Sequence, residues 1–277
     1  MDRLINYAFL LLLIFLFVLE AGADVRPRIG IALLAALFFS LLVFIMNWLT
    51  LDGAIAATVF GGIAFGVGGW EIAALILLFF ITSTLLSLKS VVIIEETAQA
   101  FSERKRRDGI QVWANGFWMA LCIIAGFVFE MDLFTIGAAA AISTATADTW
   151  ATEMGSNRFG GKTYLITNFK TVKAGEEGGV SLYGTLAALC GSLMIAFASV
   201  MLFSISWTTS LSAVFLSGFL GCIADSYFGA TFQRDDHIVN LGSDDSRLNI
   251  KLNNNFVNWA ATGFGSLTAI IINLFLL

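Results

Sequence analysis

The sequence predicts an all-α membrane protein, a polytopic bundle of about nine transmembrane helices, and three observations support this fold class. Of the 277 residues, 58% are hydrophobic and only 13% are charged, with a mean hydropathy of +0.86. A soluble domain of this composition would leave a large apolar surface exposed to water. Apolar runs of roughly 18–22 residues, long enough to cross a bilayer as helices, recur along the whole chain. Proline occurs once, at Pro27, so long uninterrupted helices are allowed.

The predicted spans cover most of the chain and form one domain over residues 1–277, in which residues 1–89 are generic helices and residues 90–277 carry the motifs. The first span is followed by Ala21-Gly22-Ala23, which resembles a signal-peptidase site, but its apolar stretch is long and favours a retained helix. The third span is rich in glycine, which lets helices approach closely. In order, the predicted spans are 4–20, 29–50, 53–70, 71–89, 112–130, 132–152, 181–204, 208–232 and 255–277.

The positions of lysine and arginine predict the orientation of these spans. All of them except Arg26 and Arg28 fall in the N-terminal segment or in the connections that follow spans four, six and eight. Basic residues concentrate in cytoplasmic loops, so the N-terminus and these connections are expected inside and the C-terminus outside. We expect a multi-pass protein of the cell (plasma) membrane whose functional side faces the cytoplasm.

Polar residues gather at the predicted cytoplasmic ends of the spans. Asp148 and Asp225 lie near the ends of spans six and eight, Asn115 lies near the start of span five, and Asn254 and Asn258 lie at the start of span nine. Ionisable groups near hydrocarbon are costly and usually mark function or a buried partner. A single aspartate that pairs with a base to fix helix packing is the alternative, but two at matching depth favour a common site.

Glu153 follows Asp148 by five residues, which places the two side chains roughly 140° apart on a continuous helix. They can share one metal ion only if the helix ends between them, and Gly155 makes such an end plausible. A solvated position at the helix end is the alternative for Glu153.

The stretch from Lys170 to Ser181 combines Lys170 and Lys173 with Gly178-Gly179 before a predicted helix start. Backbone N–H groups at a helix N-terminus, beside lysines, form a phosphate-binding site. The alternative is an ordinary loop with Ser181 as the helix N-cap. The basic cluster that ends at Arg107 has two similar interpretations, a phosphate site or a topology signal.

Carboxylates for a divalent cation, basic groups for phosphate and a glycine-rich segment are the components that phosphoryl transfer requires. The sequence lacks GxxxxGK[ST] and the protein-kinase glycine loop, so the site must be built from helix ends. One histidine, His237, and three cysteines without metal-binding spacing exclude a multi-histidine or Cys-rich centre; Cys122, Cys190 and Cys222 are expected in the packed core.

Five blocks resemble the transmembrane-protein-nineteen-like family, also called domain of unknown function ninety-two. They are KRRDGIQVWANG (105–116), ATADTWATEMGS (145–156), ITNFKTVKAGEEGGVSLYGT (166–185), GFLGCIADSYFGATFQ (218–233) and LNNNFVNW (252–259). The resemblance covers about residues 85–277, and the best characterised plant branch of the family is the phytyl-phosphate kinase. It implies an enzyme that transfers the terminal phosphate of a nucleoside triphosphate, CTP by family analogy, to a prenyl monophosphate, with Mg²⁺ as cofactor.

The resemblance also implies roles for individual residues. Asp148, Asp225, Lys173 and Arg107 would be catalytic, and Asp148, Glu153 and Asp225 would bind the metal. Relatives are expected to carry a proline near Val172-Lys173-Ala174-Gly175, which this chain lacks. The expected substrate- and nucleotide-binding residues are Asp108, Asn115, Thr149, Gly178, Gly179, Ser181, Thr185, Gln233, Asn254 and Asn258.

Two other functions remain open at the level of sequence. A lipid cytidylyltransferase would use the same metal and phosphate groups but transfer CMP from CTP. A transporter of a small anionic or lipid substrate would carry its coupling carboxylates near the bilayer midplane, whereas those of this chain lie at one end.

Overall fold

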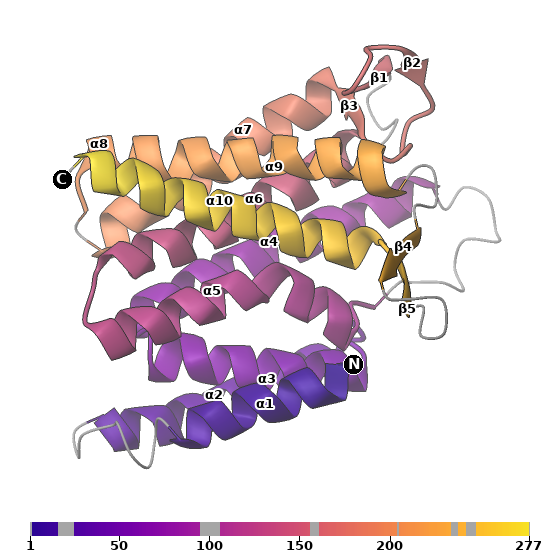
Figure 1. Cartoon of the computed structure of the whole chain (residues 1–277). Coiled ribbons are helices and arrows are strands. Elements are labelled where there is room, and N and C mark those ends of the chain that lie inside the picture. Colours follow the sequence, from indigo (N-terminus) through magenta and orange to yellow (C-terminus); the bar gives the residue numbers. More distant parts are fainter. Residues whose placement is uncertain are drawn as a thin grey trace.

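The computed structural model describes residues 2–15, 25–94, 106–155, 161–203, 205–233, 238–241 and 248–276. These residues form an all-α helical bundle with two small antiparallel sheets at one end (Figure 1). The N- and C-termini lie at opposite ends of the bundle. The main helices are α1 (Asp2–Phe15), α2 (Val25–Ile45), α3 (Leu51–Gly66), α4 (Trp70–Ile94), α5 (Gly109–Phe129), α6 (Leu133–Gly155), α7 (Leu182–Phe203), α9 (Leu216–Phe228) and α10 (Asn254–Leu276).

Six helical segments of the described residues are long and apolar enough to cross a membrane. Helix α3 is apolar but shorter, with 16 residues. The all-α membrane bundle predicted from composition is therefore confirmed. Six candidate spans are found among the described residues, and the number of membrane-spanning helices lies between six and the nine that were predicted. The six segments are Arg26–Ile45, Trp70–Leu88, Gly109–Phe129, Leu182–Phe203, Trp207–Gln233 and Asn254–Phe275.

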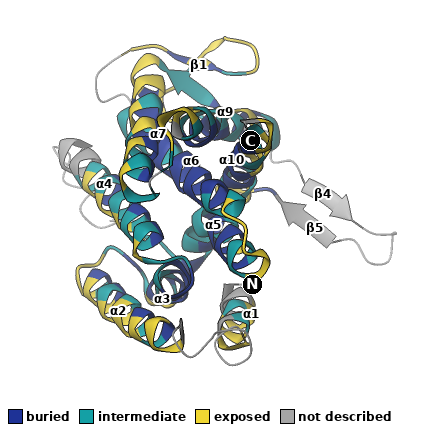
Figure 2. Cartoon of the chain, turned by 90° about the vertical axis from the view of Figure 1, so that its left-hand side faces the viewer, coloured by how far each residue is buried: buried dark blue, intermediate teal, exposed yellow. Residues whose placement is uncertain are grey.

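Helix α6 occupies the centre of the bundle, where it packs against α4, α5, α7, α9 and α10. Every residue from Ile136 to Ala147 is buried, and Figure 2 shows the middle of this helix in the buried colour. Most of these residues are small, which permits close helix approach. Gly218 and Gly221 of α9 face Ser143 and Thr144 of α6 so closely that a Cβ atom at either glycine would overlap them. The close α6–α9 packing therefore positions the residues that follow on both helices.

The predicted span 208–232 is correct in extent but is not a regular α-helix. It consists of α8 (Trp207–Thr209), a π-helical segment η3 (Ser210–Phe215), α9, and a second π-helical segment η4 (Gly229–Gln233). Single π-helical turns inside α-helices often occur at functional sites. Segment η4 directly follows the helix that carries Asp225.

Two small sheets cap the end of the bundle at which α5, α7 and α10 begin (Figure 1). Strands β1 (Thr163–Leu165), β2 (Thr171–Val172) and β3 (Gly179–Ser181) form one antiparallel sheet in the order β2-β1-β3. Strands β4 (Ile238–Leu241) and β5 (Leu248–Lys251) form a hairpin.

The predicted start of the seventh span at residue 181 is confirmed, but Gly178-Gly179 belong to an ordinary turn, which was the alternative interpretation, and not to a phosphate-binding helix N-terminus. Gly178 has a φ of +76°, which glycine adopts without strain, and it closes a turn into β3. The N–H of Gly179 donates to the carbonyl of Glu176 at 2.9 Å, so this amide is already used. Helix α7 begins only at Leu182, and Ser181 Oγ accepts the N–H of Gly184 at 3.2 Å, as expected of an N-cap.

Candidate functional site

A cavity of about 830 Å³ lies at the end of the bundle that carries the β1–β3 sheet. Its wall combines the C-terminal ends of α6 and α9 with the N-terminal ends of α7 and α10 and the turn before β3. Helix N-termini carry a partial positive charge that favours anions. The predicted site residues that line it are Arg107, Asn115, Asp148, Thr149, Glu153, Gly178, Gly179, Ser181, Thr185, Asp225, Asn254 and Asn258.

Asp148 of α6 and Asp225 of α9 meet in the wall of this cavity. Their carboxyl groups hydrogen bond to each other, although 77 positions separate them in the sequence. Two carboxyl groups can form this bond only with a proton between them, because an ionised carboxylate has no donor. With its amide oriented to satisfy its neighbours, Asn258 donates Nδ2 to Asp225 Oδ2 at 3.1 Å. The prediction that the sixth and eighth spans bring their aspartates together is confirmed.

Glu177, also in the cavity wall, adds a third acidic side chain near the aspartate pair, and its charge acts on both aspartates. Burial, with a smaller contribution from Glu176, raises the pKa of Glu177 above its ordinary value. In the amide orientation that satisfies both groups, Gln233 donates to Glu177 Oε2 at 3.0 Å and accepts the N–H of Asn254 at 2.6 Å. Gln233 thus supports the site from behind the wall. The sequence analysis did not select Glu177; its position next to Gly178-Gly179 was the available signal.

Arg107 lies at the opposite part of the wall, in the segment that leads into α5. Its backbone is fixed, since its N–H donates to the carbonyl of Trp48 and its own carbonyl accepts the N–H of Thr50, both at 3.1 Å. The guanidinium carbon lies 5.7 Å from the ring centres of both Phe79 and Phe80, within the range of cation–π attraction. Arg107 is therefore held in one place with its charge directed at the cavity.

Glu153 is a neighbour of Arg107 rather than of the aspartate pair. Helix α6 continues to Gly155, so the break that Glu153 and Asp148 would need to share one ion is absent. Glu153 Oε1 instead accepts a hydrogen bond from Ser87 Oγ of α4 at 2.6 Å. Burial lowers the pKa of Arg107, and the charge of Glu153 opposes this shift. The geometry does not support Glu153 as a metal ligand and assigns it instead to Arg107.

Asp108 and Lys173 lie outside the cavity wall. Asp108 is the N-cap of α5, and its Oδ1 accepts the N–H of Gln111 at 2.9 Å in a capping box. Lys173 is exposed on the turn after β2. Arg107 is therefore the single basic residue among the described residues that line the cavity.

The carboxyl pair suits a hard divalent cation. Within the described part of the chain, no three His, Cys, Asp or Glu side chains come close enough to bind one ion directly. Mg²⁺ does not require such a cage, since it is usually bound by one or two carboxylates together with substrate phosphates and water. Asp148 and Asp225 supply the oxygen donors that this arrangement needs.

Residues 34–266 match the family described as Integral membrane protein DUF92. The chain belongs to this family. The match begins earlier than residue 85, where the resemblance was expected to begin, and takes in most of α2 and all of α3 and α4. Membership also supports the conclusion that this is an integral multi-pass membrane protein.

Two similar proteins place this DUF92 member among archaeal and plant relatives. It is 30% identical to Uncharacterized membrane protein MJ0933 of Methanocaldococcus jannaschii, over 88% of this chain and 94% of that protein. It is 28% identical to Protein VTE6, chloroplastic, of Arabidopsis thaliana, over 84% of this chain and 68% of that protein. No solved structure is significantly similar to this chain.

Gly178→Ala is expected to inactivate the site of this DUF92 protein, because an added Cβ would overlap the Cα and N of Ala230 in η4, each 2.6 Å away. The turn that carries Glu177 would have to move off η4. Gly175→Ala is the matched control, since Gly175 also has a positive φ, +84°, but no atom within 4 Å of its Cβ position. We expect Gly178→Ala to lower the thermal unfolding temperature and the activity more than Gly175→Ala does. Equal effects would show that backbone strain alone, and not the contact with Ala230, matters here.

Proposed function

We propose that this protein is a membrane prenyl-phosphate kinase that transfers the terminal phosphate of a nucleoside triphosphate, CTP by family analogy, to an isoprenoid monophosphate. The observation that carries the proposal is the hydrogen-bonded Asp148–Asp225 pair in the same cavity as the fixed guanidinium of Arg107. The resemblance to the plant phytyl-phosphate kinase branch and the similarity to Protein VTE6 support the same reaction class.

The cavity wall carries more negative than positive charge, so it favours anionic substrates only when divalent cations are bound to them. Five acidic residues line it, Asp148, Glu153, Glu176, Glu177 and Asp225, against Arg107. Polyphosphates would be repelled by this wall unless divalent cations bridged the carboxylates and the phosphates. Bound Mg²⁺ would neutralise phosphate charge and orient the transferring group, and Asp148 and Asp225 would hold it.

The remaining residues position the two phosphates for direct transfer. An oxygen of the prenyl monophosphate attacks the γ-phosphorus of the nucleotide, the bond from that phosphorus to the β,γ-bridging oxygen breaks, and nucleoside diphosphate leaves. The attacking oxygen is already ionised, so no general base is required. Arg107 stabilises the charge on the transferring group. Asn258 holds Asp225 in place, and the N–H of Asn254 holds Gln233, which in turn donates to Glu177. Thr149 offers its hydroxyl group to phosphate oxygens, whereas the hydroxyl of Thr185 already donates to the carbonyl of Ser181 at 2.9 Å.

The cavity would open on the cytoplasmic side of the membrane, where nucleoside triphosphates are available. Lys162, Lys170 and Lys173 at the same end are exposed, while Arg28 lies at the opposite end and donates Nε to the carbonyl of Gly66 at 3.0 Å. This distribution agrees with the orientation predicted from the basic residues.

The test supplies purified protein in lipid with Mg²⁺, phytyl monophosphate and CTP labelled at either the α- or the γ-phosphate. The proposal expects a prenyl diphosphate that carries the γ-label and release of CDP. Product that carries the α-label would instead show a cytidylyltransferase. Flux of a lipid phosphate or other anion into proteoliposomes, with no nucleotide consumed, would favour a transporter and overturn the kinase assignment.

A further inference from the structure

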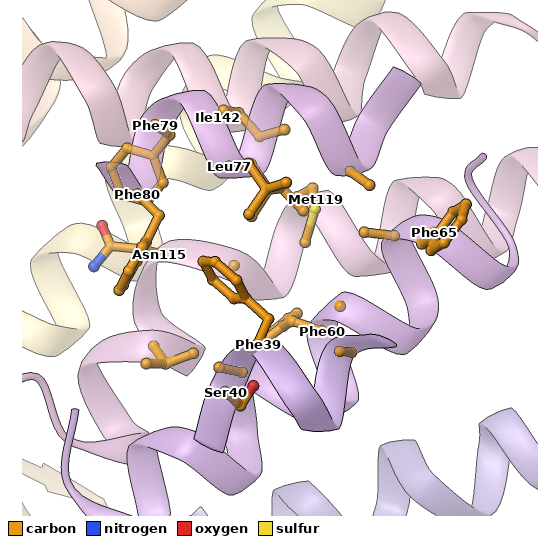
Figure 3. A pocket seen from close by; sticks show the side chains of 18 of the residues that line it. Phe39, Ser40, Phe60, Phe65, Leu77, Phe79, Phe80, Asn115, Met119 and Ile142 are labelled. Carbon is orange, nitrogen blue, oxygen red and sulfur yellow. The ribbon is translucent and has the colours of Figure 1, made fainter. Parts of the chain in front are cut away.

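A second, apolar cavity of about 480 Å³ lies deeper in the bundle, between α2, α3, α4 and α5. Figure 3 shows its wall of aromatic and aliphatic side chains, with Asn115, Phe79 and Phe80 at one end and Phe65 at the other. Besides Ser40 and the indole of Trp70, the polar lining side chains are Arg107, Gln111 and Asn115, which all belong to the segment entering α5. The cavity is therefore apolar along its length and polar at one end.

The polar end of this apolar cavity joins the cavity of the aspartate pair. Four residues line both: Phe79, Arg107, Gln111 and Asn115. Arg107 stands at this junction, with its guanidinium over the rings of Phe79 and Phe80. A molecule with a phosphate and a long hydrocarbon tail would place the phosphate beside Arg107 and the tail in the apolar cavity.

The wall reaches the membrane-facing surface along α4. Trp70, Ala73, Ala74 and Leu77 line the cavity and recur at the spacing of one helix face. Trp70 is 59% exposed and Leu77 is 38% exposed, so the cavity is not closed off from the lipid on this side. A tail can enter sideways from the bilayer without crossing the polar cavity.

We propose that this apolar cavity binds the isoprenoid tail of the substrate, which runs along α4 from the phosphate beside Arg107 toward Trp70 and Ala73 at the far end. The inference rests on the proposed function. Benzene fills an apolar cavity of about 150 Å³, or roughly 25 Å³ per carbon, so 480 Å³ accommodates on the order of 19 carbons. Along α4, Trp70 and Phe79 are about 14 Å apart. The tail class that fits has fifteen to twenty carbons.

The test narrows the far end with Ala73→Trp and compares a ten-carbon with a twenty-carbon prenyl monophosphate. Each buried methylene is worth about 0.8 kcal/mol, or nearly fourfold in binding, so exclusion of even two or three carbons is measurable. We expect kcat/KM for the twenty-carbon substrate to fall at least tenfold, with little change for the ten-carbon substrate. Ile81→Trp is the control, because Ile81 lies on the same helix, is 42% exposed and does not line the cavity.

Photocrosslinking tests the tail site without turnover. A twenty-carbon prenyl monophosphate with a diazirine on its last isoprene unit should label the Trp70–Leu77 segment of α4, and unlabelled prenyl monophosphate should compete. Labelling without kinase activity would leave the tail site standing and overturn only the proposed reaction. Turnover with equal losses for both chain lengths in Ala73→Trp, or labelling that prenyl monophosphate does not displace, would overturn the tail site and leave the kinase.

Discussion

Asp225→Asn is expected to lower kcat for prenyl diphosphate formation by roughly 10²–10³-fold, the loss that follows removal of one group that stabilises charge in a transition state. Asp148→Asn should have a similar effect. An asparagine amide can donate to the remaining carboxylate, so the hydrogen bond between α6 and α9 is kept. The thermal unfolding temperature should therefore stay unchanged or rise, because two neighbouring carboxyl groups no longer compete for one proton.

The measurement is steady-state turnover in lipid together with thermal unfolding of the same samples. Asp132→Asn is the matched control, since Asp132 is exposed in the short connection between α5 and α6 at the other end of the bundle. Near-normal turnover in both Asp148→Asn and Asp225→Asn would refute their role in holding Mg²⁺. Loss of turnover accompanied by unfolding would mean that the pair serves only helix packing.

The meeting of Asp148 and Asp225 could be predicted from the sequence because it depends on topology. Apolar runs set the number and direction of the helices, and the basic loops indicate which ends share a side. Spans six and eight cross the membrane in the same direction, because one span of the opposite direction lies between them. Two aspartates near the C-terminal ends of these spans must then lie at the same depth. The structure adds the contact itself, which requires the small residues Gly218 and Gly221 against Ser143 and Thr144.

The parts that sequence reasoning missed are those set by short or non-local structure. Strands β1 to β3 contain two or three residues each, too few for an alternating pattern to show. The turn at Gly178-Gly179 was therefore interpreted as a phosphate-binding segment before a helix, with an ordinary loop as the alternative, and Glu177 was overlooked. Helix α6 continues past Asp148 to Gly155, with no break to bring Glu153 round to the same face.

The apolar cavity could not be predicted either, because helices from the first half of the chain form most of it. In the sequence, the apolar residues of these helices look like ordinary lipid-facing residues, because composition does not distinguish a side chain that faces lipid from one that faces a cavity. Only the packing of α2 and α4 around α3 and α5 reveals the difference. The family match from residue 34 onward agrees with a functional role for these helices.

Arg107→Lys is expected to reduce kcat by about 10²-fold, although it keeps the positive charge. A lysine ammonium is a strongly hydrated point charge and lacks the planar group that lies against Phe79 and Phe80. The cation would no longer be held at the junction of the polar and apolar cavities, where the transferring phosphate is expected. Arginine residues that stabilise transferring phosphoryl groups contribute about 10³–10⁵-fold to rate, so a partial loss of this size is consistent with a displaced charge.

Arg106→Lys separates this effect from a general loss of positive charge, because Arg106 is the exposed neighbour of Arg107 and does not line either cavity. We expect kcat and KM of Arg106→Lys to equal those of the unchanged protein. In Arg107→Lys, a fall in kcat with an unchanged unfolding temperature supports direct action on the transferring phosphate. If only KM for the prenyl monophosphate rises while kcat is retained, Arg107 binds the substrate phosphate in its ground state and the charge that stabilises the transition state comes from elsewhere.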